Sequence, residues 1–349
     1  MRSFIHWGQG REKDFGILLP MLPEDIDTLV VPFLGNGDIL LNANAKAFTA
    51  GDRCEELIDI WRFVSRPQPI LIEMLSTLAD LWDHLPDYSK GLHDRLYNVY
   101  DSLVMGAWDD YLSLSSAVGR VTDELRLPEF LTSCLKGWKT EDYCMELRHQ
   151  LIAALEAAKH LGMKNGDKFE KRMHCAEMTA LYEYLVFLYN TPDVRPRVKA
   201  AILLWAQSCA KNHRFQKDDS DSYSPDFSLE MADTADFRLQ VKVLENSRFF
   251  TRMKSTALYK KDALVLLNCE QPGKRDFIFV DPPCLYGKRK KKGRMFTRDE
   301  QNRLADFLLN KTSARWMIIL PQIDPVADRY IDAGMKTMAL NDELIIWNY

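Results

Sequence analysis

A short apolar run late in the chain, Phe-Ile-Phe-Val at residues 277–280, leads directly into Asp-Pro-Pro-Cys at residues 281–284. Apolar residues stopped by two prolines predict a buried strand that ends in a fixed turn. At the carboxyl end of a strand in an open α/β sheet, such a turn faces the crevice in which ligands bind. The Asp281 carboxylate and a carbonyl fixed by the proline rings would give two acceptors for an exocyclic amine. A proline-stopped strand that ends in a solvated Asp is the alternative interpretation.

A second short apolar run, residues 29–34, precedes Gly35-Asn36-Gly37-Asp38 and a further apolar stretch at 39–41. A strand, a glycine turn and a helix predict the start of a nucleotide-binding βα unit, in which glycines let the backbone approach a ligand closely. In such units an acidic residue at the end of the second strand binds ribose hydroxyls, and Asp52 stands at the corresponding position. A lone Gly-x-Gly often marks only a turn. The sequence contains no Gly-x-x-x-x-Gly-Lys-Ser/Thr run, so a P-loop is not expected.

In this order, the motifs resemble those of the Dam-type DNA adenine N6-methyltransferases. Residues 6–11, His-Trp-Gly-Gln-Gly-Arg, are similar to the family's Lys-Trp-Ala-Gly-Gly-Lys opening. Residues 32–37 are similar to its Pro-Phe-x-Gly-x-Gly loop, and residues 281–284 to its catalytic Asp-Pro-Pro-Tyr. Downstream, residues 296–305 and 343–349 resemble its tail.

The resemblance implies an α/β Rossmann-like methyltransferase fold, with a mixed sheet, a C-terminal β-hairpin and a large inserted helical domain. Residues 1–62 and 245–349 would form a discontinuous S-adenosylmethionine-binding and catalytic domain. Residues 63–244 would form a helical target-recognition insertion. Strands are expected near 255–259, 315–320, 335–340 and 343–349, and helical patterns cover 70–85, 91–116, 140–161, 169–189 and 197–211.

The resemblance also implies the cofactor and the roles of particular residues. S-adenosylmethionine would be held by Trp7, Arg11, Phe33, Gly35, Gly37, Asp52, Asp262 and Asp281. Asp262 is equally compatible with a helix cap. The catalytic turn would comprise Asp281, Pro282, Pro283 and Cys284.

The implied reaction is methyl transfer to adenine N6 in DNA. The amine of adenine is a poor nucleophile because its lone pair is delocalised into the ring. Asp281 and the Pro282 carbonyl would accept its hydrogens and favour a pyramidal nitrogen that faces the sulfonium methyl. The adenine has to leave the duplex to be reached, so base flipping is expected.

Two residues depart from the family's pattern. Arg11 stands where the family has Lys, and the two side chains differ in hydrogen-bond geometry. Cys284 stands where the family has a Tyr that stacks on the flipped base, an interaction worth ~1–3 kcal/mol. Tyr286 is a candidate substitute. Cys284 supports the alternative of a non-catalytic subunit that binds DNA or cofactor in a defence or regulatory assembly. A third possibility is amine methylation on cytosine or RNA.

A run of basic residues without an acid follows the predicted catalytic turn, which favours contact with phosphates. A solvated loop is the usual alternative. Lys211 and Arg214, in a stretch that mixes basic, amide and aromatic residues, are further candidates for DNA contact, or the solvated end of a helix. The run comprises Lys288, Arg289, Lys290, Lys291, Lys292, Arg294 and Arg298.

Composition restricts the remaining choices. A net charge of −4 means that any DNA-binding surface has to be local. The seven cysteines show no metal-ligand spacing, so reduced thiols and no metal site are expected. Neither a signal peptide nor an apolar stretch of membrane-spanning length is apparent, and a cytoplasmic protein without a membrane partner is therefore expected.

Overall fold

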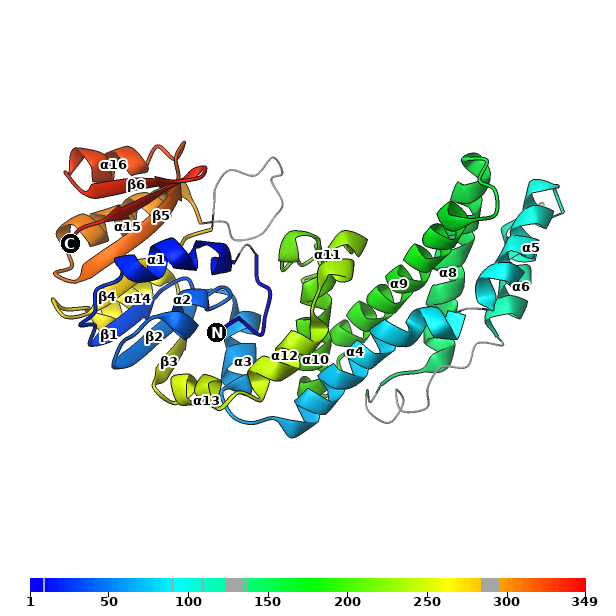
Figure 1. The fold of residues 1–349 in the computed structure, drawn as a ribbon, viewed down its shortest axis with the longest axis horizontal. Helices are drawn as coiled ribbons and strands as arrows, with labels where there is room; N and C mark the ends of the chain where they lie inside the picture. The colour runs from blue at the N-terminus through cyan, green and yellow to red at the C-terminus, as the bar shows by residue number, and fades with distance from the viewer. Residues whose placement is uncertain (9, 90, 108–109, 124–134, 136, 284–295) are drawn as a thin grey trace. The chain divides into compact units, whose positions relative to one another are not determined.

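The computed structural model describes the chain except for residues 9, 90, 108–109, 124–134, 136 and 284–295, and the side chains of residues 86–89. The described chain forms two compact units (Figure 1). Met1–Gln68 and Lys242–Tyr349 form the first, here called the sheet unit, and Pro69–Val241 form the second, the helical unit.

The sheet unit contains a seven-stranded sheet in the order β3-β2-β1-β4-β5-β7-β6. The first five strands are parallel, whereas β7 is antiparallel to both of its neighbours, β5 and β6. The α/β class, the mixed sheet and the C-terminal hairpin predicted from the sequence are therefore confirmed. The strands are β1 (Thr28–Val31), β2 (Ala47–Asp52), β3 (Thr256–Lys260), β4 (Phe277–Val280), β5 (Arg315–Pro321), β6 (Lys336–Leu340) and β7 (Glu343–Trp347).

Strand β4 has the apolar character of a strand that is covered on both faces. All four of its residues are buried. Successive side chains of a strand point to opposite faces, so neither face of β4 is open to solvent. Ile278 and Val280 pack with Leu304 and Leu308 of a following helix. This is the buried strand that the sequence predicted at residues 277–280.

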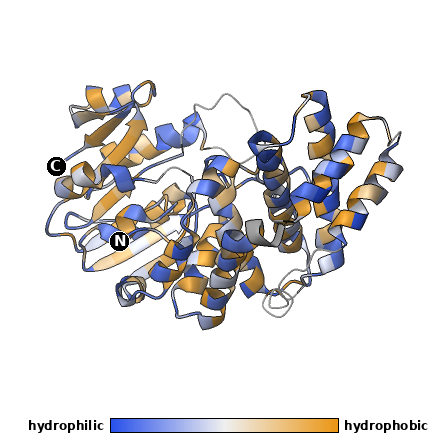
Figure 2. Cartoon of the chain, turned by 45° about the vertical axis from the view of Figure 1, so that its right-hand side comes forward, coloured by the Kyte–Doolittle hydropathy of each residue, from blue (hydrophilic) through white to orange (hydrophobic). Residues whose placement is uncertain are grey.

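Short helices connect the strands of the sheet unit. One of them, α3, places Trp61 in the core, where its ring packs edge-on against Phe4 at 4.7 Å between centroids. Figure 2 shows the strands mostly in hydrophobic colours, whereas many helices carry one apolar and one polar side. The helices are η1 (Glu12–Asp14), α1 (Phe15–Met21), α2 (Asp38–Asn42), α3 (Glu55–Val64), α13 (Ser247–Lys254), α14 (Ala263–Glu270), α15 (Arg298–Asn310) and α16 (Ala327–Asp332).

The helical unit contains longer helices joined by turns. Aromatic rings fill part of its core: Trp205 stacks on Phe237 at 5.6 Å and meets Trp82 edge-on at 5.5 Å between centroids. No described helix of either unit combines the length and the apolar character needed to cross a membrane. The helices are α4 (Pro69–Ser89), α5 (Leu92–Val104), α6 (Tyr111–Thr122), α8 (Thr140–His160), α9 (Asp167–Asn190), α10 (Pro196–Cys209), η2 (Lys211–His213), α11 (Leu229–Thr234) and α12 (Phe237–Leu244), which continues past Val241 into the sheet unit.

The helical pattern predicted over residues 91–116 is not one helix. Helix α5 ends at Val104, and Gly106 adopts a φ of +80°, which a helix does not allow. Helix α6 then begins after Asp110, whose carboxylate accepts the backbone N–H of Ser113 at 2.8 Å. Buried apolar residues lie on both sides of the break, Tyr100 and Leu103 before it and Leu114 and Ala117 after it, so the apolar pattern did not reveal it.

Candidate functional site

The carboxyl ends of neighbouring parallel strands bring the predicted motifs to one edge of the sheet. The glycine loop follows β1, Asp52 ends β2, Asp262 follows β3, and Asp281 follows β4. The chain proceeds outward from β1 to β2 and β3, then returns to the other side of β1 with β4. This reversal is the topological switch point at which open α/β sheets form a ligand crevice.

The glycine loop requires glycine at both of its positions. Gly35 and Gly37 adopt φ values of +47° and +67°, in the left-handed region that other residues avoid. A Cβ on Gly37 would also lie 2.4 Å from the ring of Trp61. The N–H of Gly37 donates to the Leu34 carbonyl at 2.7 Å and closes the turn. The result is a tight turn with small residues at the carboxyl end of β1.

The amino-terminal segment lies across this loop. The Ser3 hydroxyl donates to the Asn36 carbonyl at 2.6 Å, and the Trp7 backbone N–H donates to the Asn36 side-chain oxygen. Gly10 passes so close that a Cβ there would be 2.7 Å from the Asn36 amide nitrogen. These contacts place Trp7, which is partly buried, and Arg11 beside the glycine loop.

Arg11 extends from this segment to the turn after β4. Its Nε and Nη2 donate to the two oxygens of Asp281, at 2.7 and 2.6 Å. The adjacent edge of the guanidinium contacts Glu343 through Nη1, and through Nη2 at 3.0 Å. The Arg11 backbone N–H donates to Asp38 at 2.7 Å. The side chain of Arg11 is 10% exposed, so one buried guanidinium joins two carboxylates from different strands.

The electrostatics of this cluster keep Arg11 charged. Burial lowers the pKa of the Arg11 guanidinium, but hydrogen bonds and charges from Asp281 and Glu343 oppose it and hold the pKa above its ordinary value. Burial raises the pKa of the neighbouring Asp38 carboxyl, against the opposing effect of the Arg11 N–H. Charge-assisted, bidentate pairs of this kind are the stronger hydrogen bonds of proteins.

The pairing with Arg11 restricts what Asp281 can do. Each carboxylate oxygen can accept two hydrogen bonds, so both oxygens of Asp281 retain acceptor capacity. A further donor, such as an amine, has to bind Asp281 along the lone-pair directions that Arg11 does not use. The strand ends at Val280, and in the turn that follows Pro282 is buried and Pro283 is exposed. The sequence predicted Arg11 as a cofactor ligand and did not predict its contact with Asp281.

Asp52 lies at the end of β2, as the sequence predicted. Its carboxylate accepts the backbone N–H of Cys54 at 2.9 Å. Burial raises the pKa of Asp52, while the N–H groups of Cys54 and Gly35 act in the opposite direction. The carboxylate is therefore held beside the glycine loop, where ribose hydroxyls could donate to it.

Asp262 has two partners within the protein. It caps α14 by accepting the Leu264 N–H at 3.0 Å, which is the helix-cap interpretation of this residue. It also accepts from Nη2 of Arg53 at 2.5 Å, and the same nitrogen donates to Glu300 at 2.8 Å. The Arg53 guanidinium lies 5.8 Å from the centre of the Phe296 ring. Asp262 therefore belongs to an ion-pair cluster at the same edge of the sheet as Asp52.

The remaining predicted residues divide into four groups. Phe33 packs edge-on against Phe296 at 5.1 Å between centroids and is partly buried. Lys211 and Arg214 are exposed and belong to the helical unit. Arg298 is exposed at the start of α15. Cys284, Tyr286 and the predicted phosphate-contacting residues Lys288, Arg289, Lys290, Lys291, Lys292 and Arg294 lie outside the described residues.

The sequence did not identify four site residues: Asp38, Arg53, Glu300 and Glu343. Glu300 had a recognisable signal, because Thr297 and Glu300 form a capping box at the start of α15. Asp38 and Glu343 stand in the glycine loop and in the tail that the sequence singled out, but neither pattern gave them a role, and Arg53 has no local pattern that separates it from a surface charge. Among the described residues, no group of His, Cys, Asp or Glu side chains is arranged to hold a metal ion.

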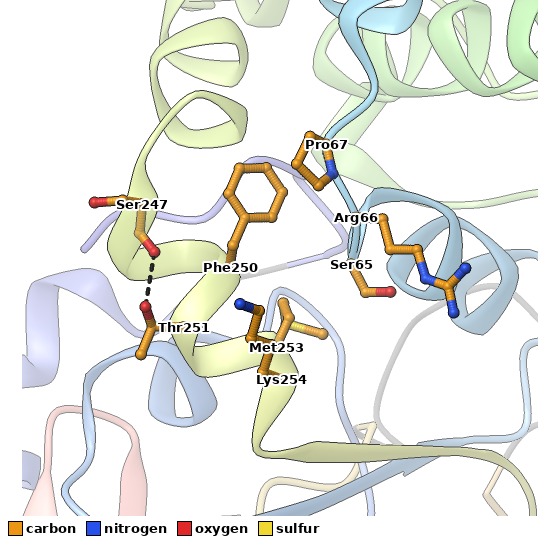
Figure 3. A pocket seen from close by; sticks show the side chains of 8 residues that line it. All are labelled: Ser65, Arg66, Pro67, Ser247, Phe250, Thr251, Met253 and Lys254. Carbon is orange, nitrogen blue, oxygen red and sulfur yellow. Dashed lines mark hydrogen bonds between the residues drawn. The ribbon is translucent and has the colours of Figure 1, made fainter.

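A separate pocket of about 530 Å³ contains none of the predicted site residues (Figure 3). Part of its lining is the segment directly after α3, and the rest is α13, the helix that precedes β3. The pocket therefore belongs to the amino-terminal edge of the strands. Thr251 donates to the Ser247 carbonyl at 3.0 Å within it. It is lined by Ser65, Arg66, Pro67, Ser247, Phe250, Thr251, Met253 and Lys254.

Comparison with models of known protein families gave no match to this chain, and comparison with curated proteins also gave none.

Proposed function

We propose that this chain is an S-adenosylmethionine-dependent DNA methyltransferase that acts on adenine N6. The observation that supports the proposal most strongly is the position of four motifs at one edge of the sheet. Gly35, Asp52, Asp262 and Asp281 follow or end four parallel strands on both sides of the switch point. An edge of this kind would offer partners to a nucleoside-containing cofactor and to an amine-bearing base.

The residues at the crevice fit S-adenosylmethionine. The left-handed turn at Gly35 and Gly37 allows close approach of the backbone, and Asp52 offers a carboxylate for ribose hydroxyls. Trp7 lies beside the same loop and supplies an aromatic face. When bound, the cofactor would supply an electrophilic methyl group on a sulfonium. We therefore assign Trp7, Gly35, Gly37 and Asp52 to cofactor binding.

The turn after β4 would orient the amine that is methylated. Asp281 accepts one hydrogen of the amine through the acceptor capacity that Arg11 leaves free, and the Pro282 carbonyl accepts the other. These two hydrogen bonds rotate the nitrogen lone pair out of conjugation and aim it at the methyl group. The gain comes from orientation and from fixed charges rather than from covalent chemistry in the protein.

DNA is the proposed substrate. The basic residues from Lys288 to Arg298 would neutralise phosphates beside the flipped base, and their contribution depends on salt. The helical unit, Pro69–Val241, would read the target site. Lys211 and Arg214 are exposed on that unit and are candidates for contact with DNA.

The test is a search for N6-methyladenine by mass spectrometry in DNA from a host that expresses the chain. The parent should produce the modified base, and Asp281→Ala should not, because the turn then lacks a charged acceptor. Cytosine and RNA from the same cells are analysed in parallel, since the turn recognises an amine and not one particular base. Methylation that persists in Asp281→Ala would contradict the proposed mechanism.

A non-catalytic module that binds DNA or cofactor is the second candidate. The bidentate contact of Arg11 with Asp281 favours it, because each oxygen of the Asp281 carboxylate already accepts one hydrogen bond within the protein. Cys284, in place of the stacking Tyr of the family, favours it as well. Calorimetry distinguishes the candidates: binding of S-adenosylmethionine without methyl transfer to any nucleic acid would support this module. If S-adenosylmethionine does not bind at millimolar concentration, the chain is neither a methyltransferase that uses it nor a module that binds it.

A further inference from the structure

Glu343 belongs to β7, in the tail that resembles the family, but the sequence assigned it no role in the site. It is the first residue of β7 and pairs with Pro321, the last residue of β5. Because β5 is parallel to β4, this pairing places Glu343 at the same edge as Asp281. The Gln322 side chain donates to the carbonyls of Asn341 and Glu343, at 2.8 and 3.3 Å, and braces the hairpin turn.

The guanidinium of Arg11 lies between two carboxylates and uses a different edge for each. The edge formed by Nε and Nη2 faces Asp281, and the edge formed by Nη1 and Nη2 faces Glu343. Nη2 has two hydrogens and donates to both partners. A planar group bound along two edges has little freedom to rotate, so its plane is fixed by Glu343 as well as by Asp281.

The position of Asp281 depends on this arrangement. With Glu343 in place, the guanidinium is a fixed template, and the carboxylate of Asp281 aligns with it through two hydrogen bonds. The unused acceptor directions of Asp281 are then fixed too. Without Glu343, Arg11 and Asp281 could turn together as a pair, or Arg11 could move toward Asp14, whose carboxylate lies 3.6 Å from Nη1.

We propose that Glu343 is a positioning residue for methyl transfer: it fixes Arg11, and Arg11 in turn directs Asp281 toward the substrate amine. The inference rests on the proposed function and adds a residue that acts on the reaction without contact with substrate or cofactor.

The first test is Glu343→Gln, which retains the shape of the side chain and removes its charge. The amide nitrogen of Gln is a donor and cannot accept from Arg11, so one of the two hydrogen bonds is lost. We expect kcat for DNA methylation to fall about 10- to 100-fold, the range associated with a small misalignment of reacting groups. The Kd for S-adenosylmethionine, measured by calorimetry, should stay within about twofold of the parent. Glu343→Asp keeps the charge on a shorter stem and should give an intermediate kcat.

Asp25→Asn is the matched control. Asp25 also pairs with an arginine of the sheet unit, Arg315, at 2.6 Å, but at the first residue of β5 and therefore at the opposite edge of the sheet. Its replacement should leave kcat unchanged. Circular dichroism and thermal unfolding of each variant separate a loss of folding from a loss of alignment.

A double-mutant cycle tests whether Glu343 acts through Arg11. In an Arg11→Ala background, Glu343→Gln should change kcat no further. Additive losses, an unchanged kcat in a folded Glu343→Gln, or a loss seen only in the Kd for cofactor would each overturn the inference and leave the proposed function intact. An inactive parent enzyme would overturn both, and is recognised by the absence of methylation before any variant is compared.

Discussion

The guanidinium of Arg11 donates two hydrogen bonds to Asp281, at 2.7 and 2.6 Å, across 270 residues of sequence. The same side chain contacts Glu343, so the amino-terminal segment, the turn after β4 and the terminal hairpin meet at one buried cation. The cluster therefore has two roles: it joins separate segments of the sheet unit, and it sets the direction of the proposed catalytic acceptor.

The structural role predicts a large cost for Arg11→Met. The substitution leaves two partly buried carboxylates without their partner, and we expect the free energy of unfolding to fall by about 3–5 kcal/mol. Urea unfolding followed by circular dichroism measures it. Arg2→Met is the control: Arg2 also pairs with a carboxylate, Glu12 at 2.7 Å, but the two side chains are 59% and 51% exposed. Its loss should cost less than about 1 kcal/mol. Equal costs would show that the buried cluster contributes no more than a surface pair.

Gly37→Ala should be more damaging than its backbone angle alone predicts. A left-handed φ costs a non-glycine residue about 1–2 kcal/mol, and at Gly37 the new Cβ would also lie 2.4 Å from the Trp61 ring. Gly334 provides the comparison, because its φ is also left-handed, at +76°. Apart from the residues next to it in the chain, no atom of the described residues lies within 4 Å of a Cβ added at Gly334. We expect Gly334→Ala to lower the unfolding midpoint modestly, and Gly37→Ala to lower it further and to abolish cofactor binding. Similar effects of both substitutions would remove the steric part of this explanation.

The stability of the helical unit should depend on the ionisation of His93. Nε2 of His93 lies 3.0 Å from Oε1 of Glu177, which is almost completely buried, and this hydrogen bond raises the pKa of His93. His174 approaches the other Glu177 oxygen at 3.9 Å. Since the folded pKa of His93 exceeds the unfolded value of 6.5, its contribution is complete below pH 6.5 and is lost as the pH rises through the folded pKa.

His93→Gln should therefore lower the free energy of unfolding at pH 6 by about 1.5–3 kcal/mol, the contribution of a hydrogen bond to a charged group. The loss should be smaller at a pH above the folded pKa of His93. The measurement is thermal unfolding across this pH range. The control is His149→Gln, because the His149 side chain is 65% exposed and its ring lies 3.9 Å from Glu146. If the parent and His93→Gln lose stability in parallel as the pH rises, another group is responsible.

The sequence predicted the strands well where apolar runs have clear ends. β4 has the predicted bounds because two prolines follow it directly. β1 ends at Val31, earlier than its apolar run, because Pro32 has no N–H to donate to a neighbouring strand. Helices α11 and α12 were not predicted individually, since helices of six and eight residues give too few turns for a periodic signal.

The motif residues of the crevice were predicted from order along the chain, but the interactions between them were not. Arg11 and Glu343 are 332 residues apart, and nothing beside either residue indicates the other. Their contact depends on the order of strands in the sheet and on β7 entering between β5 and β6. Side-chain pairing of this kind follows from tertiary structure, whereas glycine turns and strand ends follow from local rules.

Asp52 should make cofactor binding and stability respond to pH in opposite directions. Burial raises the pKa of this carboxyl above the ordinary 3.8, so the folded protein takes up a proton more readily than the unfolded chain. The contribution of Asp52 to stability is therefore present at acid pH and is lost as the pH rises through the folded pKa. Ribose hydroxyls need the ionised form as acceptor, so affinity for S-adenosylmethionine should fall as the pH is lowered through the same range.

Calorimetric titrations at several pH values would show this trend in the parent. The Asp52→Asn variant should bind the cofactor weakly, and its Kd should not depend on pH in this way. Asp59→Asn is the control: Asp59 is an exposed residue of α3 that pairs with Lys260, and its replacement should leave the pH profile of the parent unchanged. A pH-independent Kd in the parent would exclude Asp52 as the ribose acceptor, because a carboxylate that binds hydroxyls cannot lose its charge without losing affinity.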